Sequence, residues 1–196
     1  MPDMNDKLKI LIVEDEGIIS AGMAACVEAL GHETAGQAYT GMEAVQLAAQ
    51  EDVDIVLMDI NLPDMSGIDA LKEISRTKEI PCVFVTGYSD QHLIVEANEI
   101  SQTYGYLIKP VDQAELDAAI KIAIMRAQEK KSLKQAVYQA EKKLSDRKLI
   151  ERAKGILMDS FSMKESDAMK YMQKQSNEKN KKLAVVAEDI ISLLGK

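Results

Sequence analysis

Acidic, hydroxyl and amino side chains follow four apolar segments of this chain. The segment "ILIVED" ends at Glu14 and Asp15, and "IVLMD" ends at Asp59. Two later apolar segments end at Thr86 and Lys109. If these segments are parallel strands, their carboxyl ends meet at one edge of a sheet, where ligands bind in such folds. The five side chains would then share a small space.

Three carboxylates at one edge repel each other, and a hard cation such as Mg²⁺ relieves that repulsion while keeping water among its ligands. Asp59 is the central acid and could attack a phosphoryl group as a nucleophile. Lys109 would neutralise charge on that group, and Thr86 would donate a hydrogen bond to it. Taken singly, Asp59 could be a turn acid and Lys109 a loop entry, so the prediction depends on the joint arrangement.

Alternating strands and helices are expected to position these side chains. Apolar runs predict strands at 7–15, 33–39, 53–60, 80–87 and 104–110. Helical spacing predicts helices at 16–31, 40–51, 67–77 and 90–100, and another from residue 112. Continuous apolar strands indicate a parallel sheet buried on both faces. The predicted fold is α/β, with a flavodoxin-like, doubly wound sheet of five parallel strands.

The pattern changes after residue 112. The absence of Pro, and of Gly before Gly155, predicts one long helix over about 112–159. Apolar residues repeat along it at heptad-like spacing in Leu133, Val137, Ala140 and Leu144. This stripe predicts a short coiled coil that pairs with a second copy of the chain or with the helices that follow.

Two shorter helices are expected to complete a small three-helix, all-α domain. Ser162 and Glu165 have the spacing of a capping box, which predicts a helix over 162–175. A polar loop over 176–181 and a last helix over 181–194 should follow. Phe161 and Tyr171 are expected to lie in the core.

Charge is divided unevenly along the 196 residues. Residues 1–125 hold 7 basic against 22 acidic residues, whereas 126–196 hold 17 against 10. The basic half is a candidate for binding a polyanion, although a solvated, Lys-rich surface has the same composition. No apolar run approaches the ~20 residues of a membrane span, and the polar start does not resemble a signal peptide, so we expect a cytoplasmic protein. Cys26 and Cys82 are expected to be core thiols.

Four motifs, "VEDE", "DINLPDMSG", "VTGYSD" and "YGYLIKP", resemble those of response-regulator receiver domains over residues 7–125. The resemblance implies that Asp59 accepts a phosphoryl group from a cognate histidine kinase. It also implies that Glu14 and Asp15 form an acid pocket, with the Asn61 carbonyl and Asp59 near Mg²⁺.

The same resemblance implies that Thr86 and Lys109 contact the phosphoryl group and that Tyr106 is the switch aromatic. It implies a cis bond between Lys109 and Pro110. Haloacid-dehalogenase-type phosphatases also use an Asp nucleophile, but they need a second acid where this chain has Asn61. Neither GxGxxG nor GxxxxGK[ST] occurs, which argues against a nucleotide-binding enzyme, and we expect a regulator rather than an enzyme.

The segments "ERAKGILM" and "LAVVAEDI" resemble those of the ANTAR family, an RNA-binding antitermination module. We therefore predict a coiled-coil linker over 126–145 and an ANTAR-like domain over 146–196. The resemblance implies that a homodimer, promoted by phosphorylation, binds a pair of RNA hairpins and prevents transcription termination. The chain departs from the family pattern at Met169, Gln173 and Ser176.

Basic side chains of this region are the candidates for RNA contact. They are Arg147, Lys148, Arg152, Lys154, Lys170, Lys174, Lys179 and Lys181. The first four cluster over two helical turns as a basic stripe. Two other outputs stay open at this point: DNA binding through a helix-turn-helix, and binding of a partner protein by the coil.

Overall fold

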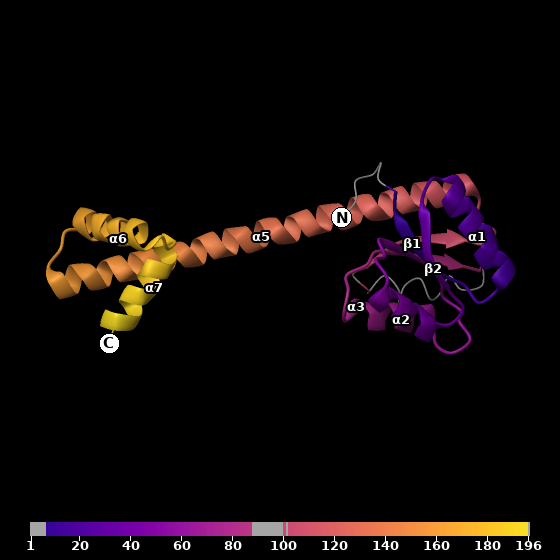
Figure 1. The fold of residues 1–196 in the computed structure, drawn as a ribbon, viewed down its shortest axis with the longest axis horizontal. Helices are drawn as coiled ribbons and strands as arrows, with labels where there is room; N and C mark the ends of the chain where they lie inside the picture. The colour runs from indigo at the N-terminus through magenta and orange to yellow at the C-terminus, as the bar shows by residue number, and fades with distance from the viewer. Residues whose placement is uncertain (1–6, 88–99, 101, 196) are drawn as a thin grey trace. The chain divides into compact units, whose positions relative to one another are not determined.

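A computed structural model describes residues 7–87, 100 and 102–195 of the chain (Figure 1). The helix predicted over 90–100 lies outside the described residues, apart from its last position. The structure divides after Lys131 into two compact units, and each is considered by itself.

The first unit is built on a five-stranded parallel sheet with the order β2-β1-β3-β4-β5. Its strands are β1 (Lys9–Val13), β2 (Glu33–Ala38), β3 (Ile55–Asp59), β4 (Cys82–Thr86) and β5 (Thr103–Ile108). Every strand pair is parallel. This is the order of the flavodoxin-like doubly wound fold, so the predicted fold class is confirmed.

Helices cover both faces of the sheet (Figure 1). One face packs against α1 (Gly17–Ala29) and the first turns of α5 (Gln113–Phe161), and the other against α2 (Gly41–Gln50) and α3 (Gly67–Ser75). β3 and β4 are buried at every residue, which explains why each is apolar up to its last residue.

Local sequence signals fix several helix ends in this unit. The hydroxyls of Thr40 and Ser66 accept hydrogen bonds from the first-turn N–H groups of α2 and α3. Gly31 follows the end of α1 with φ +86°, a conformation that suits a glycine at this position. Cys82 is fully buried, as predicted, and burial raises the pKa of its thiol, whereas Cys26 is only half-buried.

The second unit contains the rest of α5 with α6 (Glu165–Lys179) and α7 (Leu183–Leu194). The three helices enclose a small core made of Ala153, Leu157, Ala168, Met172, Val186, Ala187 and Ile190. The predicted long helix and small three-helix unit are both present. No helix in residues 7–87 and 102–195 is long and apolar enough to cross a membrane.

The predicted start of α6 is wrong. Ser162 does not cap this helix, because its backbone has φ +52° and the N-cap position is held by Lys164, without a side-chain hydrogen bond. The helix also continues to Lys179, so the connection to α7 is shorter than the predicted polar loop.

The predicted burial of two aromatic side chains is also wrong. Phe161 is 55% exposed and Tyr171 is 41% exposed. Three alanines line the core of the second unit, and their small side chains let the helices approach too closely for an aromatic ring between them.

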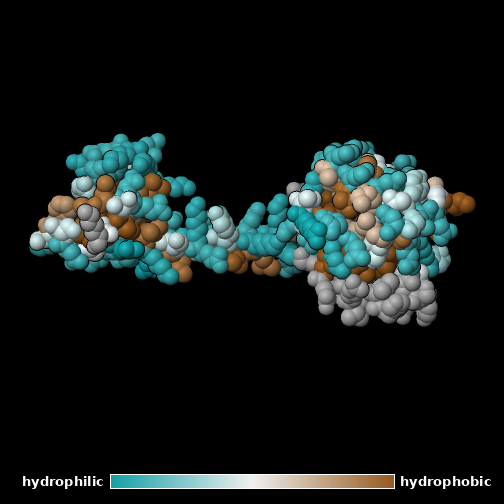
Figure 2. Space-filling view, turned by 90° about the horizontal axis from the view of Figure 1, so that it is seen from below, coloured by the Kyte–Doolittle hydropathy of each residue, from teal (hydrophilic) through white to brown (hydrophobic). Residues whose placement is uncertain are grey.

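The apolar stripe along α5 is exposed in the single chain. Leu133, Val137 and Leu144 are each 57–59% exposed, and they take no part in the core of the second unit. Figure 2 shows apolar atoms among hydrophilic ones along the surface of α5. The helices that follow therefore do not cover this stripe.

Candidate functional site

Three carboxylates meet at the carboxyl edge of the sheet. Glu14 and Asp15 follow β1, and Asp59 ends the adjacent strand β3. One oxygen from each of these residues lies within 4.8 Å of the other two. Glu14 and Asp59 are buried while Asp15 is exposed, so the cluster opens to solvent on one side.

Lys109 neutralises part of this negative charge. It comes directly after β5, and its Nζ lies 2.6 Å from Asp59 Oδ2 and 2.6 Å from Glu14 Oε2. Burial acts to lower the pKa of the Lys109 ammonium, but its hydrogen bonds with Asp59 and Glu14 and their charges outweigh burial and raise it. The Lys109–Pro110 peptide bond is cis.

The environment of Glu14 makes its negative charge costly. Burial raises the pKa of this carboxyl, Lys109 acts against that rise, and the charge of Asp59 adds to it. A second cation beside these oxygens would lower the cost further. A carboxylate cluster with an open side is the donor set that hard divalent cations prefer.

Thr86 and Tyr106 lie on the neighbouring strands. Asp59 pairs with Val85 in the sheet, so Thr86, the next residue of β4, lies at the same carboxyl edge and is fully buried. Tyr106 is half-buried, and its ring stacks on Phe84 with centroids 6.0 Å apart. Burial raises the pKa of Tyr106 to about 12, with a further contribution from Cys82.

The loop after β3 is held tightly to the acid cluster. The Asn61 N–H donates to Asp59 Oδ1 at 3.1 Å, and Asn61 also forms an isolated antiparallel bridge with Ser66. The Gly67 N–H donates to the Ile60 carbonyl at 2.8 Å. The structure thus brings Asn61 beside Asp59, together with Glu14 and Asp15.

The basic side chains of the second unit are not equally available. Lys154 has only 12% of its side chain exposed and forms ion pairs with Glu151 (2.8 Å) and Glu165 (2.7 Å). Lys181 is paired with Asp189 at 2.9 Å, and Lys174 approaches Glu178 at 3.8 Å. Five others are exposed: Arg147, Lys148, Arg152, Lys170 and Lys179. The charge of Lys179 acts on the Asp189 carboxylate, whereas the other four form no ion pair among the residues described here.

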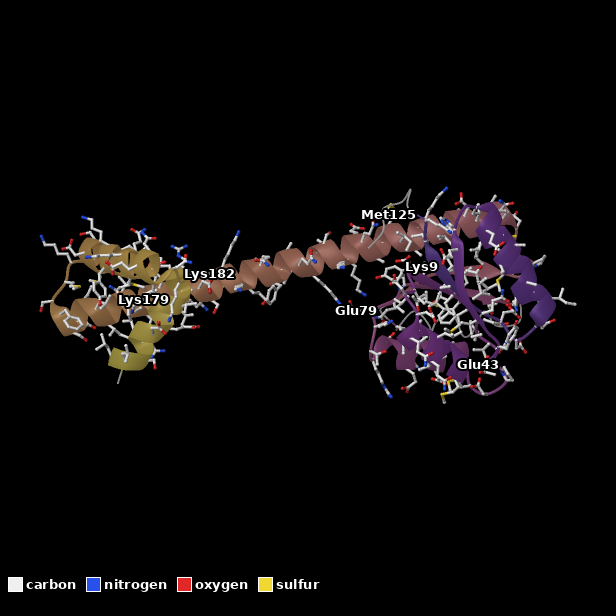
Figure 3. The ribbon with its side chains drawn as sticks, viewed as in Figure 1. Lys9, Glu43, Glu79, Met125, Lys179 and Lys182 are labelled. Atoms are coloured by element: carbon white, nitrogen blue, oxygen red, sulfur yellow. The ribbon has the colours of Figure 1, made fainter. Side chains whose placement is uncertain are left out.

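Sequence reasoning missed several residues of these surfaces. Lys182 stands at the N-cap of α7, across the exposed turn from Lys179, the last residue of α6; both are labelled in Figure 3. Lys182 directly follows the candidate Lys181 in the sequence, and this pair of lysines could have pointed to it. Asp64 and Gly67 lie in the motif "DINLPDMSG" without a predicted role of their own, and both contact the elements that hold the acid cluster.

Comparison with known proteins identifies the family of this chain. The model of the response regulator receiver domain matches residues 10–121, more than half of the chain. The chain belongs to the response-regulator family. The ANTAR domain model matches residues 138–191, so this response regulator carries an ANTAR domain after its receiver domain.

Relatives of this response regulator share one or both parts. The transcriptional regulatory protein PdtaR of Mycobacterium tuberculosis is 36% identical over 187 residues, which are 95% of this chain and 91% of PdtaR. The receiver domain of a modulated diguanylate cyclase from Desulfovibrio desulfuricans is 30% identical, with a TM-score of 0.59 over 64% of this chain and 99% of that one. The receiver domain of PhyR from Erythrobacter litoralis is 32% identical, with a TM-score of 0.54 over 61% and 91%.

Replacing Lys109 by Ala should destabilise this receiver domain and make its stability depend more strongly on Mg²⁺. The change leaves Glu14 and Asp59 without their cation, and breaking a buried pair costs ~3–5 kcal/mol. Because the Lys109 side chain is 20% exposed, we expect a smaller loss, about 2 kcal/mol. Urea unfolding followed by circular dichroism, with and without Mg²⁺, measures both effects.

The matched control is Lys121→Ala. Lys121 is half-exposed and forms an ion pair with Asp117 one helical turn away, so its loss should change stability by less than ~0.5 kcal/mol. Added Mg²⁺ should stabilise the Lys109 variant more than the wild type. An equal gain from Mg²⁺ in both proteins would contradict this account of the cluster.

Proposed function

We propose that this response regulator accepts a phosphoryl group on Asp59 from a cognate histidine kinase and thereby controls RNA binding by its ANTAR domain. The domains are a receiver over 7–125, a linker over 126–145 and an RNA-binding unit over 146–196. The observation that carries the proposal is the meeting of Glu14, Asp15 and Asp59 with Lys109 at one sheet edge.

The residues present fit a divalent cation. Glu14, Asp15, Asp59 and the Asn61 carbonyl would hold Mg²⁺, which when bound supplies positive charge to the phosphoryl oxygens. The fit rests on the chemistry of the donor atoms. Three carboxylates share the edge, and Asp15 is exposed to solvent, so a cation held there could keep water molecules among its ligands.

The chain's own residues then carry the transfer. An Asp59 oxygen attacks phosphorus in line, the bond from phosphorus to the kinase's histidine nitrogen breaks, and the electron pair stays on that nitrogen. Lys109, already 2.6 Å from Asp59 Oδ2, would stabilise charge on the phosphoryl oxygens. The Thr86 hydroxyl would donate a hydrogen bond to one of them.

The response is passed through the strand that carries Tyr106. Movement of Thr86 toward the phosphoryl group would change the packing of Phe84 and Tyr106, which are paired across β4 and β5. This shifts a population between two states of the receiver surface, and a full switch from 1:99 to 99:1 needs ~5.5 kcal/mol.

The output is RNA binding by a homodimer. The exposed stripe of Leu133, Val137 and Leu144 on α5 would bury its apolar surface against the same stripe of a second copy. The exposed basic residues without carboxylate partners, Arg147 and Lys148 foremost, would contact RNA phosphates. Lys154 is the least suited candidate, because two glutamates already bind it.

The test compares RNA captured from total transcript by the untreated protein and by protein treated with acetyl phosphate and Mg²⁺. We expect treatment to enrich RNAs that contain two neighbouring hairpins and to tighten their binding. Arg147→Ala combined with Lys148→Ala should weaken binding and reduce the salt slope of log K by about 0.7–0.9 for each lost phosphate contact. Lys121→Ala, which removes one positive charge from the receiver, is the control and should bind as the wild type does.

Light scattering tests the dimer with a matched pair of variants. Val137→Glu places a charge on the exposed apolar stripe, whereas Gln139→Glu places the same charge on another face of α5. The treated wild type and Gln139→Glu should form dimers, and Val137→Glu should stay monomeric. Capture of duplex DNA instead of RNA, or equal RNA binding before and after treatment, would refute the proposed function.

A further inference from the structure

Asp64 joins the loop that carries the acceptor residue to a different helix. This residue lies between β3 and α3, five positions after Asp59. Its Oδ1 accepts a hydrogen bond from the Gly41 N–H at 2.7 Å, and its Oδ2 accepts one from the Met42 N–H at 2.9 Å. Both donors are in the first turn of α2, and both bonds lower the pKa of the Asp64 carboxyl.

The rest of the α2 terminus is capped from within. The Glu43 N–H donates to the Thr40 hydroxyl at 3.1 Å, and the Tyr39 N–H donates to the carboxylate of Glu43, labelled in Figure 3, at 2.8 Å. Helix termini leave their first N–H groups without helical partners. Asp64 therefore accepts hydrogen bonds from two N–H groups, of Gly41 and Met42, that the Thr40 cap does not satisfy.

The two segments also touch closely through apolar atoms. A Cβ on Gly41 would overlap the side chain of Met65, the residue after Asp64. Met65 packs against the core cluster that lies under α2 and α3. The loop is thus held to α2 by two charged hydrogen bonds and by a packed methionine.

These contacts connect α2 with the loop after β3, beside the acid cluster. α2 follows β2, and the end of β2 is bonded to the end of β1, where the Glu14 N–H donates to the Ala38 carbonyl at 3.0 Å. On the other side, Asp64 belongs to the loop that starts at Asp59 and contains Asn61. The Asp64 carboxylate is therefore a second link, beside the direct pairing of β1 with β3, between the strand carrying Glu14 and Asp15 and the loop carrying Asp59 and Asn61.

We propose that Asp64 is a positioning residue that fixes the Asp59–Asn61 loop relative to Glu14 and Asp15 by its two hydrogen bonds to α2. The inference rests on the proposed function, because it concerns Mg²⁺ binding and phosphoryl acceptance at that cluster. Partners that orient the ligands of a metal change its affinity by ~10–100-fold when they are removed.

The experiment measures Mg²⁺ binding by isothermal titration calorimetry and phosphorylation by acetyl phosphate at saturating Mg²⁺ in the full-length chain. Asp64→Ala should weaken Mg²⁺ binding about tenfold. Asp64→Asn keeps one acceptor oxygen, but its NH2 group cannot accept the second hydrogen bond, so its Mg²⁺ affinity should lie between those of the wild type and Asp64→Ala. This variant also covers the case in which the alanine variant does not fold.

Two controls separate positioning from general loss of stability. Asp69→Ala removes an exposed carboxylate of α3 that pairs with Lys72, and this variant should bind Mg²⁺ as the wild type does. Thr40→Ala weakens the α2 cap but leaves the bonds of Asp64, so it should lower the melting temperature without a tenfold change in Mg²⁺ affinity.

Wild-type affinity in Asp64→Ala would overturn the inference and leave the proposed function standing. An equal loss of affinity in Thr40→Ala and Asp64→Ala would also overturn it, because the effect would then come from α2 stability. Absence of both Mg²⁺ binding and phosphorylation in the wild type would overturn the proposed function and this inference together.

Discussion

Asp59→Asn is expected to take up no phosphoryl group from acetyl phosphate, while the wild type takes up one. The amide lacks the anionic oxygen that attacks phosphorus, and no other carboxylate of the cluster is as central or has Lys109 Nζ and the Asn61 N–H both in contact with it. Intact-protein mass spectrometry after treatment with acetyl phosphate and Mg²⁺ measures the uptake directly.

The variant should stay folded. The one oxygen of Asn at position 59 can accept the hydrogen bond from Lys109, while the bond from the Asn61 N–H is lost, and losing the Asp59 charge removes a repulsion that raises the pKa of Glu14. We expect its free energy of unfolding to lie within about 1 kcal/mol of the wild type. Loss of uptake can then be assigned to chemistry and not to unfolding.

Asp52→Asn is the matched control, since its side chain is 86% exposed and pairs with Lys9 at the amino edge of the sheet. It should be phosphorylated at the wild-type rate. Uptake of one phosphoryl group by Asp59→Asn would identify Glu14 or Asp15 as the acceptor and would contradict the assignment.

The cluster at the carboxyl edge could be predicted from the sequence because it follows from the order of parallel strands in the sheet. Apart from Lys9 at the start of β1, Asp59 at the end of β3 and Thr86 at the end of β4, these three strands are apolar, as a sheet buried on both faces predicts. Parallel strands then bring Glu14 and Asp59 together whatever the loops do. The same argument places Lys109 after β5, although only the structure gives its two 2.6 Å contacts.

Contacts between a loop and a distant helix could not be predicted in this way. Asp64 bonds residues 22 and 23 positions earlier, and no periodic pattern connects a loop to a distant helix terminus. Glu151, three residues before Lys154, was a local hint that this lysine is paired, but Glu165 reaches it only after the chain reverses.

Local signals also failed where tertiary structure overrides them. The capping-box spacing of Ser162 and Glu165 was real, but α5 runs on to Phe161 and the chain reverses with Ser162 at φ +52°, which leaves its hydroxyl unable to act as the cap. Aromatic residues were assigned to the core by type, and the alanine-lined contacts of the second unit exclude them.

Gly67→Ala should unfold or strongly destabilise the receiver domain. A Cβ at this position would overlap the backbone carbonyl oxygen of Asp59 and would approach Met58 Cγ to 3.1 Å. Backbone atoms at the end of a central strand cannot move aside, because β3 is hydrogen-bonded to a strand on each side. We expect a loss of about 3 kcal/mol or more, at the upper end for overpacking, out of a typical total of ~5–15 kcal/mol.

The clash cannot be relieved by withdrawing α3 either. The Gly67 N–H is bonded to the Ile60 carbonyl at 2.8 Å, and the Ser66 hydroxyl caps the helix at the Ile68 N–H, so moving α3 would break the loop that positions Asn61. Urea unfolding monitored by circular dichroism gives the change in midpoint. Phosphorylation of any folded fraction should also be slower, because the same clash displaces the Asp59 backbone.

Gly22→Ala is the matched control, because the same substitution is expected to raise stability at this position. Gly22 lies in the interior of α1, and a Cβ there would meet no atom within 4 Å. Alanine restricts the unfolded chain and favours the helix, so this variant should be more stable by ~0.5–1 kcal/mol. If Gly67→Ala unfolded at the same urea concentration as Gly22→Ala, the close contact between the start of α3 and the end of β3 would be wrong, and with it the tight coupling of Asp59 to its loop.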